Sequence, residues 1–229
     1  MLGSRASVVI DGVYPELDCG RYPVKREVGD RLEVRADIIK EGHDILAAVL
    51  KYREKGTRKW SETSMTLLNP GLDLWIGSFA LPKNTRYEYT IEAWFDEFET
   101  WRSGTGKKVD DGQAVELELS EGRQLVEDAY SRSKDKRLGQ TLSGFDAAGY
   151  EGKLAILCSE EVRELMRRHP DRSESTTYKK LEVTVDRERA RYGAWYEMFP
   201  RSQGTEPGRS ATFREAEERL PEIAEMGFD

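Results

Sequence analysis

The residue pattern predicts a mixed α and β protein that changes character three times along its 229 residues. From Val8 to about Trp101, apolar and polar residues alternate with a period of two, which is typical of half-buried strands. From about Ser103 to Pro170 the apolar spacing becomes helical. An aromatic segment and one amphipathic helical segment follow Arg191. We therefore expect four parts, at residues 1–102, 103–172, 173–190 and 191–229.

The composition is that of a globular protein with a net charge of −7. Its longest apolar run, residues 45–50, is far shorter than the roughly 20 residues that a membrane-spanning helix needs. The acidic balance argues against a general nucleic-acid surface, because phosphate binding requires clustered positive charge. Residues 1–12 show no signal-peptide pattern. We expect a cytoplasmic protein with no nucleic-acid and no membrane partner.

The sequence offers no spacing typical of a metal or cofactor site. Cys19 and Cys158 form no CxxC pair, and we interpret them as free thiols of a reducing compartment. His43 and His169, the only histidines, are predicted to lie at the surface. The segment SGTGKK lacks the spacing of a phosphate-binding loop. We expect no cofactor and no metal ion.

Residues 1–102 read as a series of strands separated by turns. RLEVRADI (31–38) and TRYEYTIEAWFD (85–96) alternate cleanly, which predicts one buried and one wet face for each strand. Turn residues separate the strands expected between them, at 45–54, 58–68 and 72–81. Strands of this length and spacing predict an antiparallel β-sandwich of immunoglobulin or fibronectin type.

Residues 103–172 are predicted to form a small helical insert. The charged segment 131–152 is punctuated by glycines and predicts a partly ordered connector. On both sides of it, apolar residues recur at helical spacing, and Ser159 stands where an N-cap belongs. The expected helices are 119–133, 153–158 and 159–170, and a last sandwich strand is expected within the return segment 173–190.

Residues 191–229 are predicted to form one βα unit. The aromatic segment GAWYEMF (193–199) is the expected strand, and TFREAEERLPEIAEMG (212–227) is the expected helix. Its signals are a capping box formed by Thr212 and Glu215, a kink at Pro221 and a C-terminal glycine, Gly227.

Four segments of the chain carry a family resemblance: GRYPVKREVGDRLEVRADIIKEGHD, YEYTIEAWFDEFETWR, VDRERARYGAWYEMFPRS and TFREAEERLPEIAEMGFD. In this order they closely resemble the N-terminal part of the bacterial α-1,4-glucan:maltose-1-phosphate maltosyltransferases, members of the α-amylase superfamily. The resemblance covers nearly the whole chain and is weakest around residues 131–152. Its most specific portion is AWYEMFPRS followed by RLPEIAEMGFD.

The resemblance implies a β-sandwich, a helical insert that contributes to a homodimer, and the first βα unit of a (β/α)8 catalytic barrel, truncated in this chain. The family transfers maltosyl from α-maltose 1-phosphate to an α-1,4-glucan with retention. Retention requires a carboxylate nucleophile and a carboxylic acid/base, which this superfamily places on later barrel strands. We therefore expect an accessory and dimerisation part without catalytic or substrate-binding residues, inactive alone.

Two other interpretations stay open. The first is a stand-alone glucan-binding sandwich, with Trp94 and Trp75 as sugar-stacking candidates because a flat ring covers the apolar face of a pyranose. For both residues we favour packing within the protein: Trp94 under the insert or a partner subunit, and Trp75 in a core or interface. The second is an adhesion domain, which the missing disulfide framework and signal peptide disfavour.

Other aromatic and acidic residues are expected to have structural roles. Trp101 is expected to seal the junction between the sandwich and the insert. Glu197, on the predicted barrel strand, is expected to be buried and hydrogen-bonded instead of catalytic. Without further barrel strands, helix 213–226 should dock on a neighbouring molecule or be mobile, because nothing covers Phe213, Leu220 and Ile223.

Overall fold

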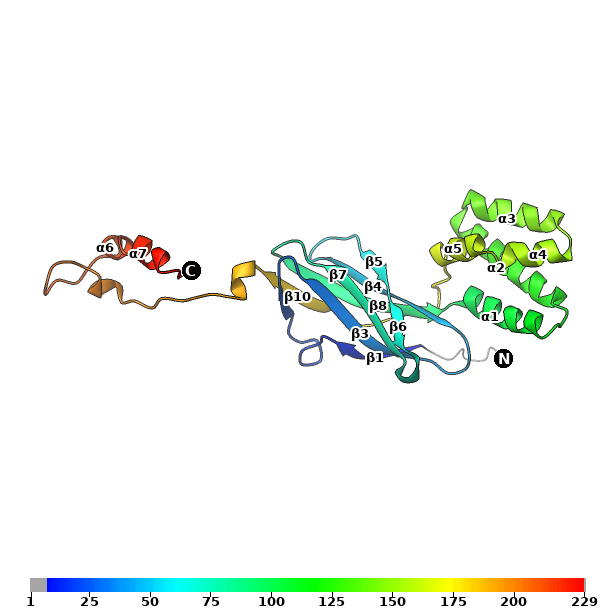
Figure 1. Ribbon diagram of the computed structural model, residues 1–229, viewed down its shortest axis with the longest axis horizontal. Helices are drawn as coiled ribbons and strands as arrows, with labels where there is room; N and C mark the ends of the chain where they lie inside the picture. Colours follow the sequence, from blue (N-terminus) through cyan, green and yellow to red (C-terminus); the bar gives the residue numbers. More distant parts are fainter. Residues whose placement is uncertain (1–7, 229) are drawn as a thin grey trace.

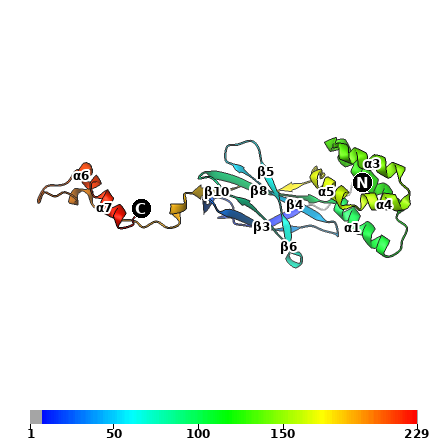
Figure 2. The same cartoon turned by 45° about the horizontal axis from the view of Figure 1, so that its top comes forward.

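The computed structural model describes residues 8–228 as an elongated molecule with three parts in a row. Two β-sheets occupy the middle, a helical unit lies at one end, and the C-terminal tail extends from the other (Figure 1). The turned view in Figure 2 shows the same order. Residues 1–7, which belong to the stretch without a signal-peptide pattern, and Asp229 lie outside the described residues.

The middle part consists of two sheets. The smaller sheet has the strand order β1 (Val9–Tyr14), β3 (Arg31–Ile39), β7 (Leu74–Ala80), β6 (Thr66–Asn69), with all neighbours antiparallel. The larger sheet has the order β2 (Val24–Glu27), β10 (Leu181–Asp186), β8 (Arg86–Phe95), β4 (Leu46–Glu54), β5 (Ser61–Ser64), and β9 (Thr176–Thr177) also pairs with β8. Its neighbours are antiparallel except β10 and β2, which are parallel.

The two sheets share one hydrophobic core, an arrangement consistent with the predicted β-sandwich. The strands predicted at 31–38 and 85–96 are confirmed as β3 and β8. Alternation along β3 buries every second residue, as the period of two requires. The core residues from both sheets include Leu32, Val34, Ala36, Ile38, Leu50, Phe79, Tyr89, Ile91 and Val183.

The prediction of a wet face is wrong for β8, which is buried on both faces. The outward residues Glu88, Thr90, Glu92 and Trp94 are all buried. Side chains from the segment before β10 lie over part of this face: the Arg172 guanidinium carbon is 4.2 Å from the centre of the Trp94 ring, and the Ser175 hydroxyl donates to Glu92 at 2.8 Å. A distant part of the chain therefore covers a face that the local pattern marks as exposed.

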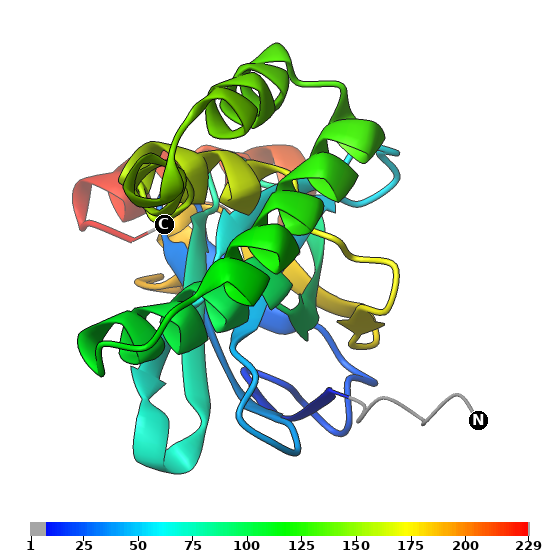
Figure 3. The same cartoon turned by 90° about the vertical axis from the view of Figure 1, so that its right-hand side faces the viewer.

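The second part is a unit made of the helices α1 to α5. It lies in front of the sheets when the molecule is viewed from this end (Figure 3). The helices are α1 (Glu97–Asp110), α2 (Glu116–Ser133), α3 (Lys136–Ala147), α4 (Tyr150–Leu157) and α5 (Glu160–Arg168). They enclose a core of their own, which includes Phe98, Trp101, Leu119, Val126, Leu138, Phe145, Leu157 and Leu165. The Ser159 hydroxyl caps α5, as predicted, by accepting from the Val162 N–H. The predicted boundary between residues 102 and 103 falls inside α1.

The partly ordered connector predicted at 131–152 is wrong, because most of this segment is helical. In α3, Leu138, Leu142 and Phe145 recur at spacings of four and three residues and pack against the core of the helical unit. These positions form one helical stripe. Because glycines are also typical of turns, a prediction based on turn residues misses this helical stripe.

The third part, the tail from residue 191, lies away from both cores (Figure 1). The strand predicted at 193–199 is wrong, because no described strand lies beside this segment to pair with it. The predicted helix is broken into α6 (Phe213–Glu217) and α7 (Leu220–Glu225), with Pro221 in the first turn of α7. Proline lacks an N–H and clashes with the preceding turn, which accounts for the break.

The predicted helix caps of the tail are confirmed, whereas the exposure of its side chains is only partly as expected. Thr212 and Glu215 form the capping box, and Gly227 has the positive φ of 86° that favours glycine at a helix end. Phe213 is 83% exposed, as expected, but Ile223 is buried within the tail itself. Glu197, expected to be buried, is exposed.

Candidate functional site

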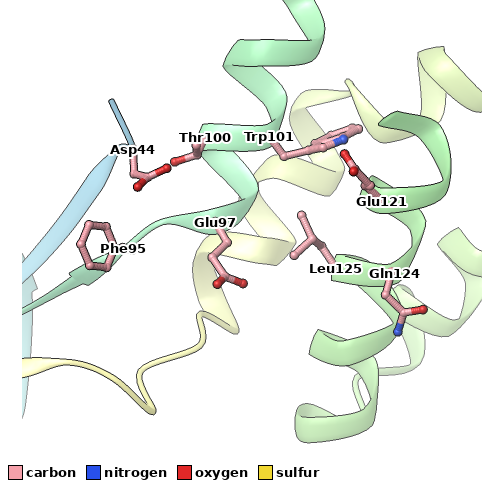
Figure 4. A pocket seen from close by; sticks show the side chains of 8 residues that line it. All are labelled: Asp44, Phe95, Glu97, Thr100, Trp101, Glu121, Gln124 and Leu125. Carbon is pink, nitrogen blue, oxygen red and sulfur yellow. The ribbon is translucent and has the colours of Figure 1, made fainter. Parts of the chain in front are cut away.

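A cavity of about 530 Å³ lies between the end of the sandwich and the first two helices (Figure 4). Its volume falls within the range of roughly 300–1,000 Å³ typical of small-molecule sites. Trp101, at its base, is buried, whereas the polar lining residues at its mouth are largely exposed. The lining comprises Asp44 and Phe95 from the sandwich, Glu97, Thr100 and Trp101 from α1, and Glu121, Gln124 and Leu125 from α2.

The wall that α1 forms is fixed at Asp96, the single residue between β8 and α1. Its carboxylate accepts the Glu99 N–H at 2.9 Å and so caps α1. The Asp96 N–H donates to the Ile45 carbonyl at 2.8 Å, and the Ile45 N–H donates to the Thr100 hydroxyl at 2.7 Å. These bonds fix the first turn of α1 to the beginning of β4.

The second wall of the cavity is held by Trp101, which lies at the junction where the sequence predicts it. Its indole N–H donates to the Glu118 carbonyl on α2 at 2.7 Å. Its ring lies against Gly122 of the same helix and 5.3 Å from the ring centre of Phe98. The missing side chain at Gly122 lets α1 and α2 approach closely beside the cavity.

The pKa values of two carboxyl groups at this junction are shifted in opposite directions. Burial raises the pKa of Asp96 above its ordinary value, although the hydrogen bond from Glu99 and the charges of Arg167 and Arg163 oppose the rise. The hydrogen bond from the Lys108 ammonium lowers the pKa of Glu118. The N-cap of α1 is therefore a partly buried carboxylate, and its burial makes the ionised form less favourable.

Asp96→Asn is expected to match or exceed the wild-type stability at neutral pH, whereas Asp96→Ala should lose about 1 kcal/mol of unfolding free energy. Asparagine keeps an oxygen for the Glu99 N–H and removes the buried charge. Because the pKa of Asp96 is raised on folding, its favourable contribution is present below the unfolded-state pKa and is lost as pH rises through the folded-state pKa. Urea unfolding at several pH values measures both variants.

The advantage of Asp96→Asn over the wild type should therefore grow as pH rises from the acid range to neutrality. A difference between asparagine and aspartate that stays constant over this range would contradict the burial argument.

The two tryptophans proposed for sugar stacking lie outside this cavity. Trp94 is 6% exposed, and the guanidinium carbon of Arg172 lies 4.2 Å from the centre of its ring. Trp75 is 8% exposed and belongs to the sandwich core. Each ring would have to lose contacts to meet a sugar. The stacking role stays a prediction, and these positions favour the alternative of packing within the protein.

Trp94 adjoins a charged network that fastens the return segment to the sheet. Glu92 accepts from Lys51 at 2.9 Å, from Ser175 at 2.8 Å and from Arg172 at 3.4 Å. Burial opposes ionisation of Glu92, but the hydrogen bonds from Lys51 and Ser175 and the nearby positive charges outweigh it and lower its pKa. The Glu92 carboxylate is thus fully engaged in holding the fold together.

The residues considered for redox or metal chemistry lie apart from the cavity. Cys19 and Cys158 are free thiols, as predicted. His169 is partly buried instead of lying at the surface, with a ring nitrogen 3.1 Å from an Asp135 carboxylate oxygen. Within residues 8–228, no cluster of three or more potential ligands could hold a metal ion. In the same part of the chain, no helix is long and apolar enough to span a membrane.

Comparison with known proteins identifies the two packed parts of the chain. The family description "α-1,4-glucan:maltose-1-phosphate maltosyltransferase, domain N/S" matches residues 6–187. The chain belongs to this family. The match spans both sheets and the whole helical unit. It confirms the resemblance carried by the four sequence segments.

Individual relatives extend the likeness over nearly the whole chain. The α-1,4-glucan:maltose-1-phosphate maltosyltransferase of Myxococcus xanthus is 46% identical over 235 residues, which cover 97% of this chain and 35% of the relative. The proteins of the same name from Chlorobaculum tepidum and Rhodospirillum rubrum are 44% and 39% identical, covering 98% of this chain and 34% and 35% of their own lengths. The chain spans about a third of the length of these relatives.

Proposed function

We propose that this chain is the accessory and dimerisation part of an enzyme that transfers maltosyl from α-maltose 1-phosphate to an α-1,4-glucan with retention. The observation that carries the proposal is the domain N/S match over both packed parts, in a chain that spans about a third of relatives named for this transfer. The two free thiols support a cytoplasmic enzyme. The homodimer implied by the resemblance would form through the helical unit.

Strand order supports the finer assignment of the sandwich to the immunoglobulin type. The order β1-β3-β7-β6 corresponds to the ABED sheet of such domains, and β10-β8-β4-β5 corresponds to the GFC sheet with an added C′ strand. The helical unit is then an insertion between the F and G strands. This end of the sandwich also carries the loop between β3 and β4, which contains Asp44.

The tail supports the proposal that a (β/α)8 barrel begins near residue 193. Its aromatic residues Tyr192, Trp195, Phe199 and Phe213 are strongly exposed. Leaving such a side chain wet forgoes roughly 1.5–3 kcal/mol of burial. We infer that further barrel strands and helices cover these residues in the longer enzyme. The two carboxyl groups of retaining transfer, which lie about 5–5.5 Å apart, would stand on those further strands.

A transfer assay tests the proposed function. The 229-residue chain, incubated with maltose 1-phosphate and maltoheptaose, is expected to release no phosphate and to lengthen no glucan. The full-length protein from Myxococcus xanthus serves as the positive control under the same conditions. Phosphate release coupled to glucan elongation by the 229-residue chain alone would contradict an accessory role.

A further inference from the structure

We propose that the cavity between the sandwich and the helical unit binds a neutral maltooligosaccharide, the end of an α-1,4-glucan chain, and rejects the phosphorylated donor. The choice of sugar rests on the proposed function. The existence and the charge selectivity of the site rest on the lining residues themselves.

The surfaces inside the cavity suit a pyranose ring. The partly buried side chains of Phe95, from the sheet, and Leu125, from α2, supply the accessible apolar surface, whereas the Trp101 ring is turned toward α2 and supports the helical wall from behind (Figure 4). The C–H face of a sugar ring packs on such aromatic and aliphatic groups. The polar residues Asp44, Glu121 and Gln124 are exposed at the mouth, where the hydroxyl rim of a sugar would meet them.

The polar groups offer both hydrogen-bonding roles. Asp44, Glu97 and Glu121 present carboxylate oxygens, which accept bonds from sugar hydroxyls. The Gln124 amide, which donates one hydrogen to Asp128 at 2.9 Å, retains a second to donate, and the Thr100 hydroxyl, which already accepts from Ile45, retains its own proton. A sugar hydroxyl both donates and accepts and can use both kinds of group. A simple cationic amine could use only the carboxylates.

The charge of the lining distinguishes the two sugars of the proposed reaction. Three of the eight lining residues are acidic, and none of the eight is basic. A phosphate group in the cavity would meet only like charges, whose repulsion strengthens where water is partly excluded. A neutral glucan meets no such penalty. The lining therefore selects the uncharged acceptor chain over maltose 1-phosphate.

The location of the cavity agrees with a binding role. It lies where the loop before β4 meets the insertion after β8. In variable immunoglobulin domains this same end of the sandwich carries the loops that recognise ligands. The hydrogen bonds of Asp96, Ile45 and Thr100 hold the cavity walls in place before a ligand arrives, which reduces the entropic cost of binding.

A blocking variant and a matched control test the site. Leu125→Trp adds bulk where α2 faces the cavity, whereas Leu117→Trp makes the same change at a residue of α2 that is 68% exposed and does not line it. Leu125→Trp is expected to weaken maltotetraose binding by about tenfold or more, because the added indole occupies the site of the sugar. Leu117→Trp should bind like the wild type.

The 229-residue chain is titrated with maltotetraose, maltose 1-phosphate and choline, and amide resonances are followed. The expected result is a saturable shift of resonances at the cavity with maltotetraose only, reduced in Leu125→Trp. No shift with millimolar maltotetraose, shifts confined to other regions, or equal binding of maltose 1-phosphate or choline would each overturn the proposal. None of these results would alter the transfer assay of the full-length relative, so the two proposals fail separately.

A second variant covers the case in which Leu125→Trp does not fold. The double change Glu121→Ala and Gln124→Ala removes exposed groups from the cavity mouth without disturbing either core. It should weaken maltotetraose binding and leave the melting temperature close to that of the wild type. Unchanged binding in a folded double variant would overturn the assigned contacts.

Discussion

Phe79→Ala should lower the free energy of unfolding by about 3–5 kcal/mol. Phe79 of β7 is 2% exposed and lies at the centre of an aromatic group that joins the two sheets. Its ring stacks on Tyr52 with 4.2 Å between ring centres, and the rings of Tyr87 and Tyr89 lie 6.3 Å away. Truncation would leave a cavity and remove three aromatic contacts that neighbouring side chains cannot replace.

Phe213→Ala provides the matched control, because the same truncation in the tail removes a ring that is 83% exposed. Its effect should stay within about 0.5 kcal/mol. Equilibrium urea unfolding monitored by circular dichroism compares both variants with the wild type. Similar losses for the two variants would contradict the view that the sandwich core, and not the tail, supports the fold.

Gly122→Ala should destabilise the helical unit by about 1–3 kcal/mol through overpacking. A methyl group at this position of α2 would collide with the Trp101 indole and lie 2.6 Å from its atom Cε2. The indole cannot retreat easily, because its N–H is bonded to Glu118 and the first turn of α1 is fixed to Ile45. Relief requires α1 and α2 to move apart, which would also reshape the junction cavity and weaken maltotetraose binding.

Gly104→Ala is the control for this change. Gly104 lies inside α1 with open space where its Cβ would be. Alanine there should add roughly 0.5–1 kcal/mol of stability, because it has the higher helix propensity. Thermal unfolding of the two variants should therefore shift in opposite directions. A neutral or stabilising effect of Gly122→Ala would show that the contact between α1 and α2 adapts freely.

The sequence pattern alone predicts an element correctly where the element's own alternation or cap determines its structure. β3 follows its alternation closely, and α5 begins at the cap that Ser159 marks. The stripe of α3 is equally present in the sequence, but glycines interrupt it, and glycine is also a typical turn residue. The burial of the outward face of β8 could not be predicted from the strand alone, because Arg172 and Ser175, which contact this face, come after five intervening helices.

The cavity could not be located from any one stretch of sequence. Its eight residues come from the loop before β4, the end of β8 with α1, and α2. The sequence places several of them in predicted elements, but only Trp101 is expected at the junction. None of these segments has a motif, because the site consists of the space that the helices leave beside the sandwich. The predicted tail strand fails for a related reason: a strand needs neighbours, and the described chain supplies none at 193–199.

The order of the strands has a consequence for biosynthesis. Among the described strands β2 pairs only with β10, so Val24 has no partner strand until Val183 has been translated, after the whole helical unit. During this interval the hydrogen-bonding edge of β8 that β10 will occupy is also open. A nascent chain halted before β10 thus exposes an unpaired edge, the type of surface that associates with other chains and that chaperones shield. The last strand of the sandwich therefore closes the domain against aggregation as it leaves the ribosome.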